Sequence, residues 1–270
     1  MPTAATRDGA GEILLRVLAG VFALSWLGLP GFGLIDLSVT LSPDPSWQGV
    51  LEAGWGLYMT AFVGVPFVAI AIRGRSRAAP AVAALYVATM ALICSAVVAL
   101  EVPALVLAMV LGLETVIVTG APSRQVTRFP MRLTWQPLVI PLVLGLVPWL
   151  LYAWSMWSLN RQSRPERDIT IGVDHYAVQG AYALATLMLV ALAVLWPAGR
   201  VFLALIAGVA AVYLGVVSWF WYPTPGGFDR TWSGLCAVWG LAVTVLALQP
   251  RRRTSENREV AGVQRRATRR

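Results

Sequence analysis

The chain of 270 residues contains no lysine, one histidine and two cysteines. Without a lysine, the protein cannot form a Schiff base with retinal or pyridoxal phosphate. One histidine, His175, excludes haem ligation by two histidines of the same chain, and catalytic zinc sites usually take two or three histidines or several cysteines. We therefore expect no metal site and no cofactor.

Several enzyme motifs are also missing. The chain has no GxxxxGK[ST] loop for nucleotide phosphates, no GxSxG nucleophile turn, and no HExxH or CxxC pattern. These absences weigh more against an enzyme than against a binding protein or carrier. Cys94 and Cys236 lie in apolar segments, so we expect buried free thiols in place of a disulfide framework.

What the chain has in excess is apolar surface. Hydrophobic residues make up 58% of it, charged residues only 13%, and the mean hydropathy is +0.70. Soluble domains are about 45–50% apolar and about 25% charged. A bilayer accommodates such a composition, because its core is itself apolar. We therefore expect the lipid bilayer as the main partner and no nucleic acid, despite a pI near 10.3.

Segments of about 20 apolar residues, the length that crosses a bilayer, recur along the chain. We predict an all-α, polytopic transmembrane helical bundle with about eight spans. The predicted spans are 15–35, 51–72, 79–100, 102–120, 136–157, 176–196, 201–222 and 231–249. Residues 80–120 are apolar for twice a membrane thickness, so the turn between two spans is predicted at Glu101 and Pro103. A second turn is predicted at Trp196–Arg200.

The arginines indicate the orientation. Seventeen of the 21 lie in the two termini and in alternate short loops, which by the positive-inside rule face the cytoplasm. We call this the inner side and predict that both termini lie there. The predicted organisation is a cytoplasmic N-terminus (1–14), an eight-helix domain (15–249) and a disordered, arginine-rich cytoplasmic tail (250–270). The predicted location is the cell membrane, of bacterial plasma-membrane type.

Polar residues at the outer end of the sixth span form the first candidate site. Asp174 is placed to cap this helix by accepting from backbone N–H groups. His175 and Gln179 are four residues apart and share a helix face. They are candidates for binding a ligand or passing a proton. The alternative is a capped helix whose polar groups bond to neighbouring helices.

Other charged residues lie near the outer ends of spans. Asp36, Glu52, Glu101, Asp174 and Asp229 are the acids at these ends, and Arg230 is the adjacent base. They converge with His175 only if the helix order brings them together, which a single sequence does not reveal. We take Asp36, Glu101, Asp229 and Arg230 as further candidates.

Glu114 lies about 9 Å from the inner end of the fourth span at helical rise. A carboxylate at that depth is costly, which favours a role such as proton coupling. The alternative is pairing with Arg124 or Arg128, or a protonated carboxyl with a hydrogen bond to Thr115 or Thr119.

Proline, aromatic and small residues add three patterns. Pro141 and Pro148 are predicted to kink the fifth span beside a cavity. Tryptophans concentrate toward the outer side, as in Trp219–Tyr222, which suits either an interfacial belt or a cavity for an amphipathic molecule. Ala204, Gly208, Ala211 and Gly215 predict close helix packing along the seventh span.

Together these features favour a protein that binds or transports a small or amphipathic molecule, such as a lipid, from the outer side. The first alternative is a membrane-embedded acid–base enzyme that acts on a lipid-linked substrate through His175 and Asp174. The second is an accessory subunit that works with a membrane protein partner.

Overall fold

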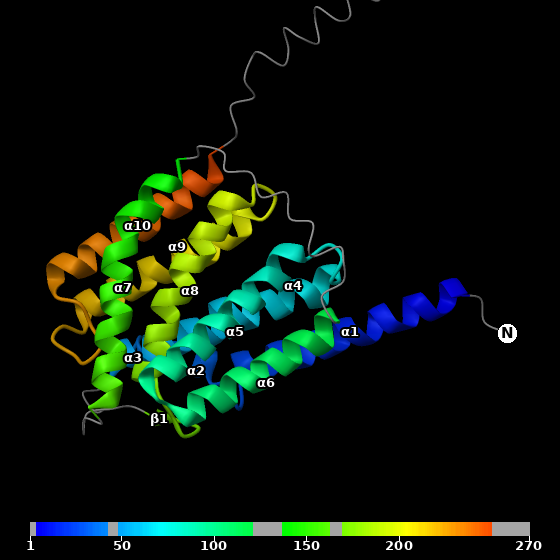
Figure 1. The fold of residues 1–270 in the computed structure, drawn as a ribbon, viewed down its shortest axis with the longest axis horizontal. Coiled ribbons are helices and arrows are strands. Elements are labelled where there is room, and N and C mark those ends of the chain that lie inside the picture. Colours follow the sequence, from blue (N-terminus) through cyan, green and yellow to red (C-terminus); the bar gives the residue numbers. More distant parts are fainter. Residues whose placement is uncertain (1–3, 43–47, 121–136, 163–168, 250–270) are drawn as a thin grey trace, which may run out of the picture.

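The protein is an all-α bundle of helices that are long and apolar enough to cross a membrane (Figure 1). The computed structural model describes residues 4–42, 48–120, 137–162 and 169–249. Its eight candidate spans confirm the predicted fold class. The helices are α1 (Ala4–Leu27), α2 (Gly33–Val39), α3 (Gly49–Leu57), the π-helix η1 (Tyr58–Gly64), α4 (Val65–Arg73), α5 (Ala79–Ala99), α6 (Val102–Thr119), α7 (Val139–Arg161), α8 (His175–Leu195), α9 (Arg200–Phe220) and α10 (Arg230–Leu248). A two-residue hairpin, β1 (Ile169–Thr170) and β2 (Val173–Asp174), precedes α8.

The predicted turns between spans are confirmed. Helix α5 ends at Ala99 and α6 begins at Val102, so the chain reverses at Leu100 and Glu101. Helix α8 ends at Leu195 and α9 begins at Arg200. Pro80 and Pro103 occupy the first turns of α5 and α6, where a proline loses no helical hydrogen bond.

The first predicted span, 15–35, is not one helix, because α1 ends at Leu27 and α2 begins at Gly33. Arg16 donates to the carbonyls of Ala71 and Ile72 at the inner end of α4 (2.8 and 2.5 Å). Trp26, ten residues later, donates through Nε1 to Glu114 on the inner half of α6 (2.5 Å). At 1.5 Å per residue, α1 rises about 15 Å between these two contacts.

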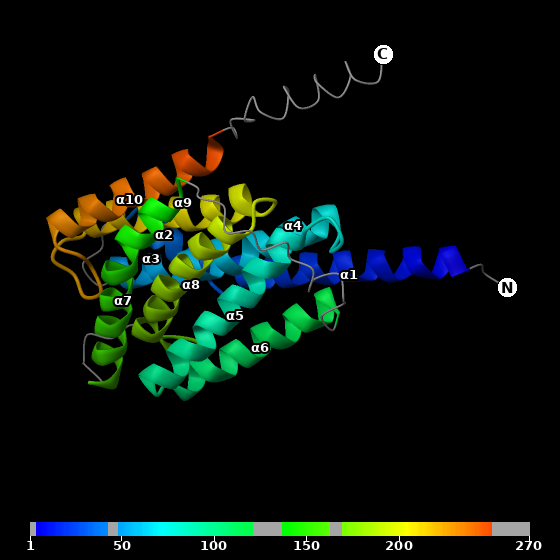
Figure 2. The same ribbon diagram turned by 45° about the horizontal axis from the view of Figure 1, so that its top comes forward.

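A turn and the short helix α2 follow α1. Residues 28–32, which include Pro30 and the left-handed Phe32 (φ 59°), turn the chain between α1 and α2. The N-terminal half of α1 extends past the ends of the other helices, whereas α2 and α3 lie at the opposite end of the bundle (Figures 1 and 2). A proline that cannot continue the helix explains why the apolar pattern over 15–35 overestimated its length.

The π-helix lies in the second span beside this break. Gly33, at the start of α2, approaches η1 so closely that a β-carbon would lie 2.7 Å from Thr60 Oγ1. Trp55 of α3 donates through Nε1 to the carbonyl of Gly31 in the turn (2.9 Å). Irregular helical segments of two spans therefore meet inside the bundle, an arrangement often associated with function.

The interior of the bundle is formed by α8, α5, α9 and the α3–η1–α4 span. Within the most apolar 18 residues of each of these spans, at least 61% are buried, against at most 33% in α1, α6, α7 and α10. The close contact predicted from the small residues of α9 is made with α10. A β-carbon at Gly208 would lie 2.8 Å from the carbonyl of Gly240, and one at Gly215 would lie 2.7 Å from Ser233 O.

The cysteine prediction is confirmed in part. Both thiols are free, and Cys236 is buried with its Sγ donating to the carbonyl of Ala211 (3.3 Å). Cys94, however, is exposed on the outward face of α5. An apolar neighbourhood in sequence does not distinguish a lipid-facing position from a core position. The tail 250–270, Arg124 and Arg128 lie outside the described residues.

Candidate functional site

Three ionisable side chains from three helices converge near the outer side of the bundle. They are Asp36 of α2, Glu52 of α3 and His175 of α8, and one ligand atom from each lies within 4.8 Å of the other two. Their side chains are 6%, 2% and 0% exposed. We call this group the Asp36–Glu52–His175 cluster. Two of its members are carboxylates, which carry a negative charge when ionised, and the third is an imidazole. All three can bind a metal ion or a proton.

Asp36 and Glu52 are positioned by short-range helical contacts. Asp36 lies in the first turn of α2, where its backbone N–H donates to the carbonyl of Phe32 (2.9 Å). Glu52 lies in the first turn of α3, and its N–H donates to Gln48 O (3.1 Å). The first turn of a helix favours an acidic side chain, because the helix dipole is positive there.

His175 is positioned by a cap and a ring contact. Asp174 accepts from the backbone N–H of Tyr176 (3.0 Å), which confirms the predicted cap of α8 and fixes His175 as its first residue. The imidazole stacks on the indole of Trp55, with ring centroids 4.8 Å apart and an interplanar angle of 21°. Because Trp55 also bonds to Gly31, one indole connects the histidine to the break in the first span.

A positive charge or a proton relieves the repulsion between the two carboxylates of the cluster. Two carboxylates this close together in a buried place repel each other when both are ionised. Removing charges from water is costly unless they are paired. A protonated imidazole offsets one negative charge, and a bound divalent cation offsets both.

Gln179, one turn after His175, has a structural contact. It is fully buried, and its Nε2 donates to Tyr152 Oη (2.6 Å), which donates to the carbonyl of Gly226 (2.6 Å). Its amide packs on Gly54 of α3, the same helix that carries Glu52. His175 and Gln179 thus both face α3, as their spacing predicts. Gln179 bridges α8 to α7 and to the loop before α10.

Glu114 lies apart from the cluster, on the inner half of α6. It is half-buried and accepts from Trp26 Nε1. The sequence suggested Thr115 or Thr119 as its hydrogen-bond partner; the hydroxyl of Thr119 instead donates to the carbonyl of Thr115 (2.7 Å). The hydrogen bond between Trp26 and Glu114 holds the end of α1 against α6.

Three other candidates from the sequence also lie outside the cluster. Glu101 accepts from Asn160 Nδ2 (3.2 Å) at the outer ends of α6 and α7. Asp229 is exposed and caps α10 by accepting from the N–H of Trp232 (2.9 Å). Arg230 is exposed, with its guanidinium 5.8 Å from the ring centroid of Tyr222. These contacts explain the three residues as helix-end groups.

The prolines of α7 line a groove on the outside of the bundle. Pro141 lies in the first turn of α7, where it has no helical hydrogen bond to lose, and its carbonyl accepts from Trp239 Nε1 (2.7 Å). Pro148 lies inside the helix and remains the predicted kink. The groove between α7 and α10 has a volume of about 360 Å³ and an almost wholly apolar lining, as expected for a surface that faces lipid chains.

The outer aromatics divide into two groups. The exposed group is suited to an interfacial belt: Trp154, Trp219, Phe220, Tyr222 and Trp232. The buried group packs inside the bundle: Trp55, Trp149 and Trp157. The excess of outer tryptophan in the sequence is therefore partly core packing.

Sequence reasoning named Asp36 and Glu52 among the acids that could converge with His175, but it did not select Glu52 as a candidate. The signal that marks Glu52 is its position inside the predicted span 51–72, because an acid within a span is a functional candidate by itself. No signal in the sequence brings together residues 36, 52 and 175, since their contact depends on how α2, α3 and α8 pack. No family model, curated protein or solved structure matches the chain.

Proposed function

We propose that this integral membrane protein binds a divalent transition-metal cation on its outer side, through Asp36, Glu52 and His175. The observation that carries the proposal is the convergence of their ligand atoms within 4.8 Å in a buried place. Two carboxylate oxygens and one imidazole nitrogen suit Zn²⁺, Fe²⁺ or Mn²⁺ better than Ca²⁺ or Mg²⁺, which prefer oxygen alone. The charge of such a cation balances both carboxylates.

The dimensions of the cluster fit a bound metal ion after a small movement of the ligand side chains. Zn²⁺ lies about 2.0–2.2 Å from its ligands, so the ligand atoms around it are roughly 3–4 Å apart. The cluster therefore closes by about an ångström on loading. Asp36 is the ligand suited to move, because α2 has only seven residues and joins α1 through the turn at residues 28–32.

The burial of the cluster favours an ion over a larger substrate. The acid–base enzyme considered as the alternative must bring a lipid-linked substrate to His175, whose side chain is 0% exposed. An ion needs far less space than a substrate headgroup. Three protein ligands also leave at least one coordination position for water or for an anion that accompanies the metal.

Metal content and thermal stability test the proposal together. The protein is purified in lipid nanodiscs, stripped with a chelator, and titrated with Zn²⁺, Mn²⁺ and Mg²⁺ while bound metal is counted by mass spectrometry. We expect about one transition-metal ion per chain. At 100 times the dissociation constant, binding stabilises a protein by about 2.7 kcal/mol, which corresponds to a rise in Tm of roughly 5–11 °C for a chain of this size.

Cluster variants and a matched acid outside the cluster separate binding from folding. Glu52→Gln and His175→Gln are expected to lose the metal and its effect on Tm, whereas Asp229→Asn, at the exposed cap of α10, keeps both. The Tm of each metal-free variant reports whether it still folds. Wild-type protein that binds no transition metal, or a Glu52→Gln variant that binds as much as wild type, would falsify the proposal.

A further inference from the structure

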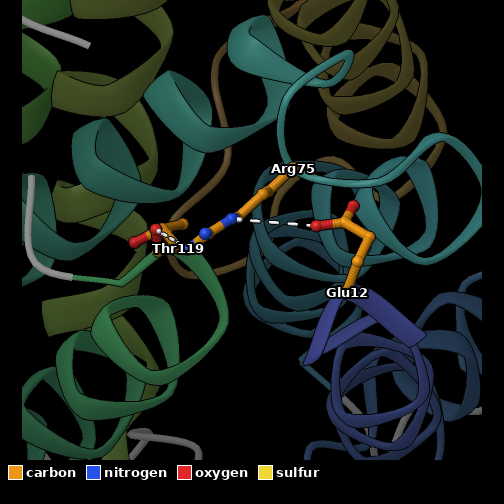
Figure 3. A network of polar contacts seen from close by, with 3 residues as sticks. All are labelled: Glu12, Arg75 and Thr119. Atoms are coloured by element: carbon orange, nitrogen blue, oxygen red, sulfur yellow. Dashed lines mark hydrogen bonds and ion pairs between the residues drawn. The ribbon is translucent and has the colours of Figure 1, made fainter. Parts of the chain in front are cut away.

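The inner-side arginines whose side chains the structure describes fall into two groups by what they contact. Three of them bond to other parts of the chain. Arg75 lies between α1 and α6, 3.8 Å from the carboxylate of Glu12 and 3.1 Å from the carbonyl of Thr119 (Figure 3). Arg16 donates to the end of α4, and Arg200 donates to the carbonyl of Gln249 (3.0 Å). These three arginines hold helix ends together.

The other two, Arg73 and Arg77, line a hollow at the inner ends of α4, α5, α8 and α9. Within the described part of the chain, neither has a hydrogen bond or ion pair to the protein. The hollow has a volume of about 310 Å³, and its walls include Pro80, Trp196 and Phe202. Ligand pockets have volumes of roughly 300–1,000 Å³, so the hollow accommodates a headgroup but not a whole lipid.

The chemistry of the hollow suits a phosphate. Two guanidinium groups offer paired N–H donors that match phosphate oxygens. The first turn of α5 also lines the hollow, and the positive end of this 21-residue helix favours an anion. No acidic residue is among the described residues that line it.

The apolar walls and the position indicate where that phosphate comes from. Trp196, which is 6% exposed, and Phe202 both line the hollow at the inner ends of α8 and α9. Aromatic walls beside a phosphate site suit the glycerol and upper acyl region that adjoin a lipid phosphate, and tryptophan is enriched at this level of membrane proteins. We propose that the hollow binds the phosphate headgroup of an anionic phospholipid of the inner leaflet, through Arg73 and Arg77.

Lipid retention in nanodiscs tests this site. The residues of the hollow are separate from those of the Asp36–Glu52–His175 cluster, so the two proposals fail independently. Wild-type protein from nanodiscs with equal phosphatidylglycerol and phosphatidylcholine is examined by native mass spectrometry. We expect one phosphatidylglycerol to be retained in preference to phosphatidylcholine. In Arg73→Gln/Arg77→Gln, its affinity falls about 30-fold, as expected for the loss of two arginines near a membrane surface.

The matched control removes the same charge on the outer side. Arg161 and Arg230 are exposed, with their guanidinium groups 5.0 Å from the ring centroid of Trp154 and 5.8 Å from that of Tyr222. Arg161→Gln/Arg230→Gln is expected to retain the lipid as wild type does. Equal losses in both double variants, or no preference for phosphatidylglycerol in wild type, overturn the proposal. Displacement of the lipid by millimolar inorganic phosphate assigns the hollow to free phosphate instead and also overturns it.

Discussion

Replacing Gly54 with alanine tests the packing beside the candidate site. A β-carbon at this position would lie 1.2 Å from Oε1 and 2.3 Å from Cδ of Gln179. The amide cannot simply turn away, because the side chain is fully buried and bonded to Tyr152. Overpacking costs about 1–3 kcal/mol. The lost hydrogen bond costs about 0.5–1.5 kcal/mol, and the gain in helix propensity offsets up to about 1 kcal/mol.

The net expectation for Gly54→Ala is a loss of about 1–3 kcal/mol, which lowers Tm by roughly 2–12 °C. Thermal unfolding in one detergent, followed by circular dichroism, measures it. Gly234→Ala is the control, because its β-carbon meets only Trp219 at an ordinary 3.6 Å. In a Gln179→Ala background the clash is removed, and Gly54→Ala should then be neutral or stabilising. An equal loss in both backgrounds would refute the reasoning, since the two sites must couple if they touch.

Two further pairs of variants test buried hydrogen bonds by the same unfolding measurement, and in the first pair Ser95 Oγ also donates to the carbonyl of Ala177. Ser95→Ala leaves the N–H of Trp157, now bonded to Ser95 Oγ at 2.6 Å, unpaired in the bundle and should cost about 1–3 kcal/mol, whereas Ser158→Ala near the outer end of α7 should change stability by less than about 0.5 kcal/mol. Similar losses in the two variants would contradict this account. Glu114→Gln keeps an acceptor for Trp26 and should be close to wild type, whereas Glu114→Leu should lower Tm measurably. If glutamine and leucine behave alike, the bond does not stabilise α1 against α6.

The candidate site shows how far single-residue reasoning extends. Asp174 was predicted to cap α8, and it does, because capping depends only on residues two or three positions apart. His175 and Gln179 share a face for an equally local reason, the helical period. Glu114 was singled out correctly as an intramembrane acid, but its partner, Trp26, is 88 residues away in the chain. Local rules identify a costly side chain without identifying what compensates its cost.

The sequence by itself determined the class of fold and the positions of nearly all the spans. Apolar length sets where a helix crosses a bilayer, and prolines and charged residues set where it ends; both are properties of short segments. The prediction of one helix over 15–35 missed the break between Leu27 and Gly33, although Pro30 lies in it, because hydropathy alone does not distinguish an apolar turn from an apolar helix.

Only the tertiary structure decided which polar residues meet. Asp36, Glu52 and His175 form one cluster, whereas Glu101 and Asp229, equally acidic and equally near the outer side, do not join it. Likewise, Arg73 and Arg77 line a hollow while Arg75 between them in sequence bonds to α1 and α6. The physical reason is the same in both cases: side-chain proximity across helices depends on their packing order and rotation, which hydropathy and charge along the chain do not encode.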